Sequence, residues 1–146
     1  MAHGEMMNIE SPATKCIALV AHDNMKREMV EWATEHHDEL KRHKLIATGS
    51  TGKLIAESTG LTIERMRSGP LGGDQQIGAR ISDGGIDVLL FFWDPLEPQP
   101  HDPDIRALLR IAVVWNIPVA CNRASADFIL SSPLIAATYQ RRVPKY

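Results

Sequence analysis

Short apolar runs alternate along this chain with segments whose apolar residues recur at helical spacing. A continuous run of four to eight apolar residues is typical of a strand that is buried on both faces of a sheet. Parallel strands need long crossovers, usually helices, so this alternation favours a parallel sheet. We therefore expect an α/β protein of the flavodoxin-like class, a three-layer, doubly wound fold whose five-stranded, mainly parallel sheet carries helices on both faces. The strands are predicted at residues 16–21, 45–48, 61–67, 86–93 and 117–121.

The segments between these runs predict helices. The first helix has one apolar stripe with spacings of three and four, as a helix packed on a sheet requires. That stripe consists of Met25, Met29, Trp32, His36 and Leu40. Further helices are predicted at 50–58, at 74–82, from 102 onward and at 125–131. In the fourth, Asp102 suits the N-cap and Pro103 the first helical position.

The size and composition exclude several classes of protein. The 146 residues fit a single domain spanning 1–146, in which we expect 1–14 to be a flexible tail. The net charge of −2 and the lack of a basic block argue against nucleic-acid binding, which depends on clustered positive charge. No apolar run approaches the roughly 20 residues of a membrane span, and no signal peptide precedes the first strand. Cys16 and Cys121 lie in apolar runs, as reduced thiols do. We expect a cytoplasmic protein with no nucleic-acid or membrane partner.

Polar clusters follow four of the predicted strands. In doubly wound sheets, ligands bind outside the carboxyl ends of the strands, so these clusters should lie at one edge. In chain order they are His22, Asp23 and Lys26; Thr48, Gly49, Ser50 and Thr51; Ser68, Gly69 and Asp74; and Asp94, His101 and Asp104.

The second cluster favours phosphate binding. Its hydroxyl groups and the unpaired N–H groups of the following helix could cradle an anion. It is not a Walker motif, because Leu54 stands where Ser or Thr is required. The alternative is a plain turn with Ser50 or Thr51 as the N-cap. Lys26 lies at the positive end of the first helix dipole, where a bound anion would stabilise it. The alternative there is a solvated Lys26 with Asp23 as N-cap.

The third and fourth clusters carry candidate acids and bases. Asp74 follows a glycine-rich loop, and His101 lies among prolines and aspartates. Histidine titrates nearest neutrality and can pass protons between oxygens. The alternative is a surface histidine, with Asp102 and Asp104 stabilising the helix that follows. The residues alone predict an enzyme or binder for a small phosphorylated molecule, with Asp74 as its acid or base and His101 as the partner.

A metal site is a weaker alternative. Five of the candidates could converge on a cation. However, the sequence lacks an HExxH motif, paired CxxC motifs and an Asp-x-Asp strand end, so we expect no metal. The five are His22, Asp23, Asp94, His101 and Asp104.

Several of these motifs, in this order, resemble those of the bacterial methylglyoxal synthase family. The likeness spans residues 15–133, and its glycine-rich block and Phe-Trp-Asp-Pro block are the most specific parts. The matching blocks are Val20–Asp23 with Lys26, Ala47–Gly52, Ser68–Gln76, Phe91–Leu96 and Pro100–Asp104.

The resemblance implies conversion of dihydroxyacetone phosphate to methylglyoxal and inorganic phosphate, without a metal or organic cofactor. It makes Asp74 the general base and His101 the neutral electrophile and proton shuttle, with Asp104 in the catalytic group. Asp23 and Asp94 are implied to be supporting carboxylates. The resemblance also implies a homohexamer that phosphate inhibits allosterically. Its reaction would provide a bypass of glycolysis when phosphate is scarce. The implied substrate-binding residues are His22, Lys26, Thr48, Gly49, Ser50, Thr51, Ser68, Gly69 and His101.

A second function stays open from sequence. The same fold resembles the regulatory domain of carbamoyl-phosphate synthetase, which binds small effectors without catalysis. Such a domain does not need an intact acid and base, whereas this chain carries both Asp74 and His101.

Overall fold

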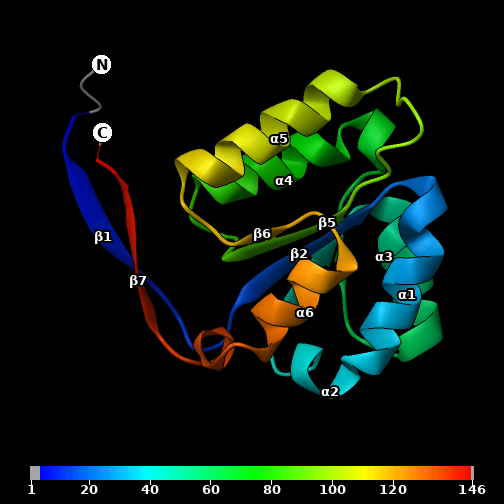
Figure 1. Ribbon diagram of the computed structural model, residues 1–146, viewed down its shortest axis with the longest axis horizontal. Helices are drawn as coiled ribbons and strands as arrows, with labels where there is room; N and C mark the ends of the chain where they lie inside the picture. Colours follow the sequence, from blue (N-terminus) through cyan, green and yellow to red (C-terminus); the bar gives the residue numbers. More distant parts are fainter. Residues whose placement is uncertain (1–3, 146) are drawn as a thin grey trace.

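A five-stranded parallel sheet lies between two layers of helices in the computed structural model, which describes residues 4–145 (Figure 1). The predicted three-layer α/β architecture is confirmed. The strands of the sheet are β2 (Cys16–Ala21), β3 (Lys44–Ala47), β4 (Glu64–Arg65), β5 (Val88–Phe92) and β6 (Val119–Ala120).

The order of the strands creates one reversal in the middle of the sheet. They run β4-β3-β2-β5-β6, which in chain order is 3-2-1-4-5, whereas flavodoxin has 2-1-3-4-5. The central strands β2 and β5 pair in parallel from Ile17 and Val88 to Ala21 and Phe92. The chain leaves these two strands toward opposite faces, so a crevice opens beyond their carboxyl ends.

The helices pack on both faces of the sheet, and each face has its own apolar core. Helices α1 (Lys26–Glu35), α3 (Gly49–Thr59) and α6 (Arg123–Ser131) cover one face, and α4 (Gly73–Ser82) and α5 (Asp102–Val114) cover the other (Figure 1). Successive strand residues point to opposite faces, so both faces of the central strands are apolar. Among residues 4–145, no helix is long and apolar enough to cross a membrane.

Several predicted boundaries differ from the observed ones. The first predicted helix breaks at His36, whose φ of −104° and ψ of 20° are not helical, and resumes as the short α2 (His37–Leu40). The third predicted strand shrinks to β4, because this edge strand pairs only through two residues with β3. His101, not Asp102, occupies the N-cap position of α5, so that prediction was wrong by one residue.

A two-stranded antiparallel ribbon joins the two ends of the described chain. It consists of β1 (Met6–Ser11) and β7 (Tyr139–Pro144) and stands apart from the main sheet (Figure 1). The predicted flexible tail over 1–14 is therefore wrong for residues 6–11; residues 1–3 lie outside the described part. Pairing between segments about 130 residues apart leaves no local signal, which is why the tail prediction failed. In β7, Arg141 and Val143 alternate inward and are buried.

Candidate active site

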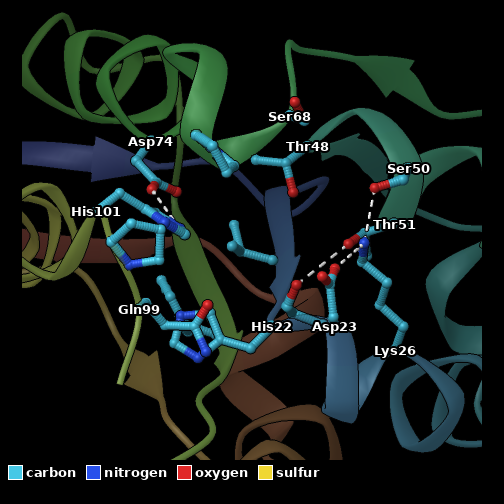
Figure 2. Close-up of a pocket in the computed structure, with 16 residues that line it drawn as sticks. His22, Asp23, Lys26, Thr48, Ser50, Thr51, Ser68, Asp74, Gln99 and His101 are labelled. Carbon is cyan, nitrogen blue, oxygen red and sulfur yellow. Dashed lines mark hydrogen bonds and ion pairs between the residues drawn. The ribbon is translucent and has the colours of Figure 1, made fainter. Parts of the chain in front are cut away.

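A pocket of about 350 Å³ opens at the carboxyl edge of the sheet, beside the ends of β2 and β5 (Figure 2). All four predicted clusters contribute side chains to it, because the parallel strands bring their carboxyl ends to one edge. The predicted site residues that line it are His22, Asp23, Lys26, Thr48, Ser50, Thr51, Ser68, Gly69, Asp74 and His101.

Asp74 and His101 face each other across one end of the pocket (Figure 2). Asp74 Oδ2 lies 3.7 Å from His101 Nε2, and Asp74 is only 2 % exposed. Within the described residues, Asp74 Oδ2 and His101 Nδ1 are buried without a hydrogen-bond partner. Burial raises the pKa of Asp74, and Asp104 raises it further, while His101 opposes the shift. A buried carboxylate with a raised pKa and an unfilled oxygen is suited to accept a proton from a ligand.

Glycines in the preceding loop bring Asp74 to this position. A Cβ on Gly73 would lie 1.9 Å from the carbonyl oxygen of Arg67, so only glycine lets the two backbone segments meet. Gly73 N–H then donates to the Ser68 carbonyl at 2.9 Å. Gly69 lies against the reacting pair, because its Cβ would be 3.0 Å from His101 Nε2 and 3.2 Å from Asp74 Oδ2. At both Gly69 and Gly73 the neighbouring atoms therefore leave little room for a side chain.

His22 presents one defined nitrogen to the pocket. The backbone N–H of Asp94 donates to His22 Nδ1 at 3.0 Å. A backbone N–H can only donate, so Nδ1 is unprotonated and Nε2 carries the proton of a neutral ring. Burial lowers the pKa of His22, and the neighbouring His101 lowers it further, which also favours the neutral form. Nε2 has no partner within the described residues, so it is a buried donor that lacks an acceptor.

The opposite end of the pocket combines a lysine with hydroxyl groups at a helix N-terminus. Lys26 Nζ donates to Ser50 Oγ at 2.7 Å and to Asp23 Oδ1 at 2.6 Å (Figure 2). The hydrogen bond from Lys26 lowers the pKa of Asp23. Thr48 occupies the N-cap position of α3 without a side-chain capping bond. Ser50 and Thr51 are therefore not the N-cap, and both lie in the hydroxyl-rich first turn of α3, which lines the pocket.

Three predicted site residues lie outside the pocket lining. Asp94 lies behind His22 and accepts hydrogen bonds from Asn24 Nδ2 and Leu96 N–H, which lower its pKa. Asp104 lies in the first turn of α5, beside Asp74 in a neighbouring surface hollow. Gly49 packs against the Ser68 backbone, where a Cβ would lie 3.0 Å from the nitrogen. None of these three is among the residues that line the pocket.

One polar residue of the pocket was missed by the sequence reasoning. Gln99 lines the wall near His22 and His101 (Figure 2). Its place two residues before His101, in the same loop, was the only available signal. Pro70 and Phe91 also line the pocket, as does the end of β2.

The possible metal ligands do not form a metal centre in the described part of the chain. Across residues 4–145, no group of three or more His, Cys, Asp or Glu side chains has an arrangement that could hold a metal ion. The Asp94 carboxylate instead accepts hydrogen bonds from the Asn24 side-chain amide and the Leu96 backbone N–H. Asp23 accepts a hydrogen bond from Lys26.

This chain is similar over most of its length to several known proteins. A family model described as an MGS-like domain matches residues 28–121. The methylglyoxal synthase of Saccharophagus degradans is 64 % identical over 92 % of this chain and 88 % of that protein. The methylglyoxal synthase of Leptospira interrogans is 54 % identical over 97 % of this chain and 95 % of that protein. A crystal structure of methylglyoxal synthase from Elizabethkingia anophelis superposes with a TM-score of 0.91 at 53 % identity, covering 96 % of this chain and 92 % of the other.

Proposed function

Because the chain belongs to the methylglyoxal synthase family, we propose that it is a carbon–oxygen lyase that converts dihydroxyacetone phosphate to methylglyoxal and inorganic phosphate. The observation that carries this proposal is the Asp74–His101 pair, 3.7 Å apart, at one end of a pocket whose other end is an anion cradle. A substrate with a phosphate at one end and an acidic C–H bond at the other fits this polarity.

The phosphate is held at the α3 end of the pocket. Lys26 supplies the positive charge, and Ser50 and Thr51 supply hydroxyl groups beside the helix N-terminus. Thr48 and the Ser68–Gly69 backbone complete the wall. Asp23 forms an ion pair with the Lys26 ammonium group and so acts as a supporting carboxylate for the phosphate site. Binding the phosphate here fixes the distance from the hydroxymethyl carbon to Asp74.

In the first step, the Asp74 carboxylate removes a proton from the hydroxymethyl carbon beside the ketone. The electron pair moves onto the ketone oxygen and gives an enediolate. The proton is only weakly acidic, so the enediolate needs preorganised donors. His22 Nε2–H and His101 Nε2 face the pocket near Asp74 and are suited to this task. Burial raises the pKa of the base, and Asp104, beside Asp74, adds to this shift, which makes Asp104 the supporting member of the catalytic group.

In the second step, His101 Nε2 gives its proton to the enediolate oxygen, and the enediol that results expels the phosphate. His101 takes a proton back from the hydroxyl on the former hydroxymethyl carbon as a C=O bond forms there, the C=C bond moves to the terminal carbon and the C–O bond to phosphate breaks. The resulting enol takes the proton held by Asp74 at its terminal CH₂ carbon and loses its hydroxyl proton to the released phosphate, which gives methylglyoxal. One substrate therefore yields one methylglyoxal and one phosphate, with no change in total redox state and no cofactor.

We extend the proposal to the wider properties implied by the family. These are a cytoplasmic homohexamer, a bypass of glycolysis, and allosteric inhibition by phosphate, which is also the product. Assembly is supported by apolar side chains left on the surface of the described chain. They include Leu96, Val113 and Phe128, which are 87 %, 74 % and 82 % exposed.

The test is a product assay on purified protein with dihydroxyacetone phosphate. We expect methylglyoxal and phosphate in equal amounts, at a rate that a chelator leaves unchanged. Phosphate released without methylglyoxal, or loss of activity with chelator, would indicate a metal-dependent phosphatase and overturn the proposal. Ligand binding without turnover would indicate a regulatory effector-binding domain. Sizing in solution, with and without phosphate, tests the hexamer.

A further inference from the structure

Asn24 joins the beginning of the first helical segment to the loop after β5. It lies in the short 3-10 helix η1 (Asp23–Met25), two residues after the pocket residue His22. Its side-chain Nδ2 donates to Asp94 Oδ2 at 2.9 Å, across 70 residues of sequence. Asn24 itself is exposed and does not line the pocket, while Asp94 is buried.

Asp94 is held at three points by this contact and its neighbours. Its Oδ2 accepts from Asn24, its Oδ1 accepts from Leu96 N–H at 3.0 Å, and its own N–H donates to His22 Nδ1. The two carboxylate bonds fix the Asp94 peptide, and that peptide fixes the histidine ring. Hydrogen bonds to a carboxylate are among the stronger ones in proteins. The chain of contacts therefore runs from Asn24 through Asp94 to the proton on His22.

The protonation of both ring nitrogens of His22 depends on these contacts through Asp94. While Asp94 N–H occupies Nδ1, the ring is neutral, with its proton on Nε2, which faces the pocket without a partner among the described residues. If the Asp94 peptide moved away, Nδ1 could take the proton, and Nε2 would become an acceptor. An acceptor at that point would repel an enediolate oxygen rather than stabilise it.

We propose that Asn24 is a positioning residue that keeps His22 as an Nε2–H donor by clamping Asp94. This inference rests on the proposed function, in which His22 donates to the substrate oxygen. It assigns a role to a side chain that never touches the pocket. It also explains why a buried carboxylate lies at this point without facing the ligand: Asp94 works through its backbone N–H.

The experiment compares Asn24→Asp with the parent enzyme. This substitution keeps the shape, removes the donor and places a second carboxylate against Asp94 Oδ2. We expect kcat to fall about tenfold, the size expected from losing one hydrogen bond to a charged group. KM should change by less than about threefold, because Lys26 and α3 still hold the phosphate. Asn24→Gln keeps an amide donor at this exposed position and should remain within about threefold of the parent.

The control is Asn122→Asp, the same chemical change at another helix start. Asn122 accepts a hydrogen bond from Ser125 N–H as the N-cap of α6, and aspartate preserves that bond. Its kcat should match the parent. Thermal unfolding of all variants shows whether any loss of rate arises from loss of structure.

A second readout follows the His22 proton directly. In protein labelled with ¹⁵N-histidine, the His22 signals are identified by their loss in His22→Gln. In the parent, Nδ1 should show the shift of an unprotonated nitrogen and Nε2 that of a protonated one; in Asn24→Asp the two should move toward each other. Unchanged His22 signals in Asn24→Asp, or an unchanged kcat, overturn the inference. The NMR result stands even if the parent makes no methylglyoxal, so failure of the function and failure of the clamp are distinguishable.

Discussion

His101 Nε2 lies 3.7 Å from Asp74 Oδ2, with the two side chains 13 % and 2 % exposed. This separation exceeds a hydrogen bond, so neither group is committed to the other. Both also have a buried atom with no partner within residues 4–145. A pair held close but unbonded is ready to exchange protons with a ligand between or beside them.

Replacement of Asp74 tests its role as the base. Asp74→Asn keeps the shape but cannot take a proton, so kcat should fall about 10²–10⁴-fold. Substrate affinity should change little, since the phosphate cradle is intact, and equilibrium binding measures it. Asp83→Asn is the control, because Asp83 is exposed at the C-terminal end of the same helix, outside the pocket. A variant at Asp74 with nearly normal turnover would rule out this base.

Replacement of Gly69 tests the packing behind the reacting pair. In Gly69→Ala the new methyl lies 3.0 Å from His101 Nε2 and 3.2 Å from Asp74 Oδ2, so the pair must shift by a few tenths of an ångström. We expect at least a tenfold loss of kcat, because catalytic geometry tolerates little displacement. Gly78→Ala, in α4, meets nothing closer than 3.9 Å and should keep full activity. Equal activity of the two variants would contradict the packing argument.

The pH dependence follows from the raised pKa of Asp74. The base works as a carboxylate, so kcat/KM should fall as the pH drops through a pKa above the ordinary 3.8. The lowered pKa of His22 keeps it neutral at and above its ordinary 6.5. The pH–rate profile of the parent should therefore be flat near neutrality and decline on the acid side. The residual activity of Asp74→Asn should lack the limb due to Asp74; a profile identical to that of the parent would assign the limb to another group.

Replacement of Lys26 tests the phosphate cradle. Lys26→Met removes the charge while keeping most of the apolar stem, so KM for dihydroxyacetone phosphate should rise about 10–100-fold, the size of one or two lost charged hydrogen bonds. Lys53→Met is the matched control, because Lys53 is exposed on α3 and does not line the pocket. Weak binding of inorganic phosphate to Lys26→Met, measured by calorimetry, checks the same point without turnover. Unchanged KM would place the phosphate elsewhere.

Much of the site follows from the sequence, because local patterns determine it. Apolar runs such as 16–21 mark strands, and a polar residue after a parallel strand must lie at the shared carboxyl edge. That rule predicts that His22, Lys26, Asp74 and His101 lie at one edge of the sheet, and all four line the pocket. The supporting positions were less predictable, since Asp94 and Asp104 follow the same rule yet lie outside the lining.

What the sequence determined by itself is the five strands of the central sheet, the helices between them and the chemistry of the residues at their ends, because these depend on neighbours within a few positions. The tertiary structure alone decided what depends on distant segments. It placed β2 beside β5, where the crevice opens, and paired β1 with β7 across about 130 residues. It also fixed the proton on His22 through a hydrogen bond from Asp94, 72 residues away. Such contacts are absent from any local pattern, since they form only when the whole chain has packed.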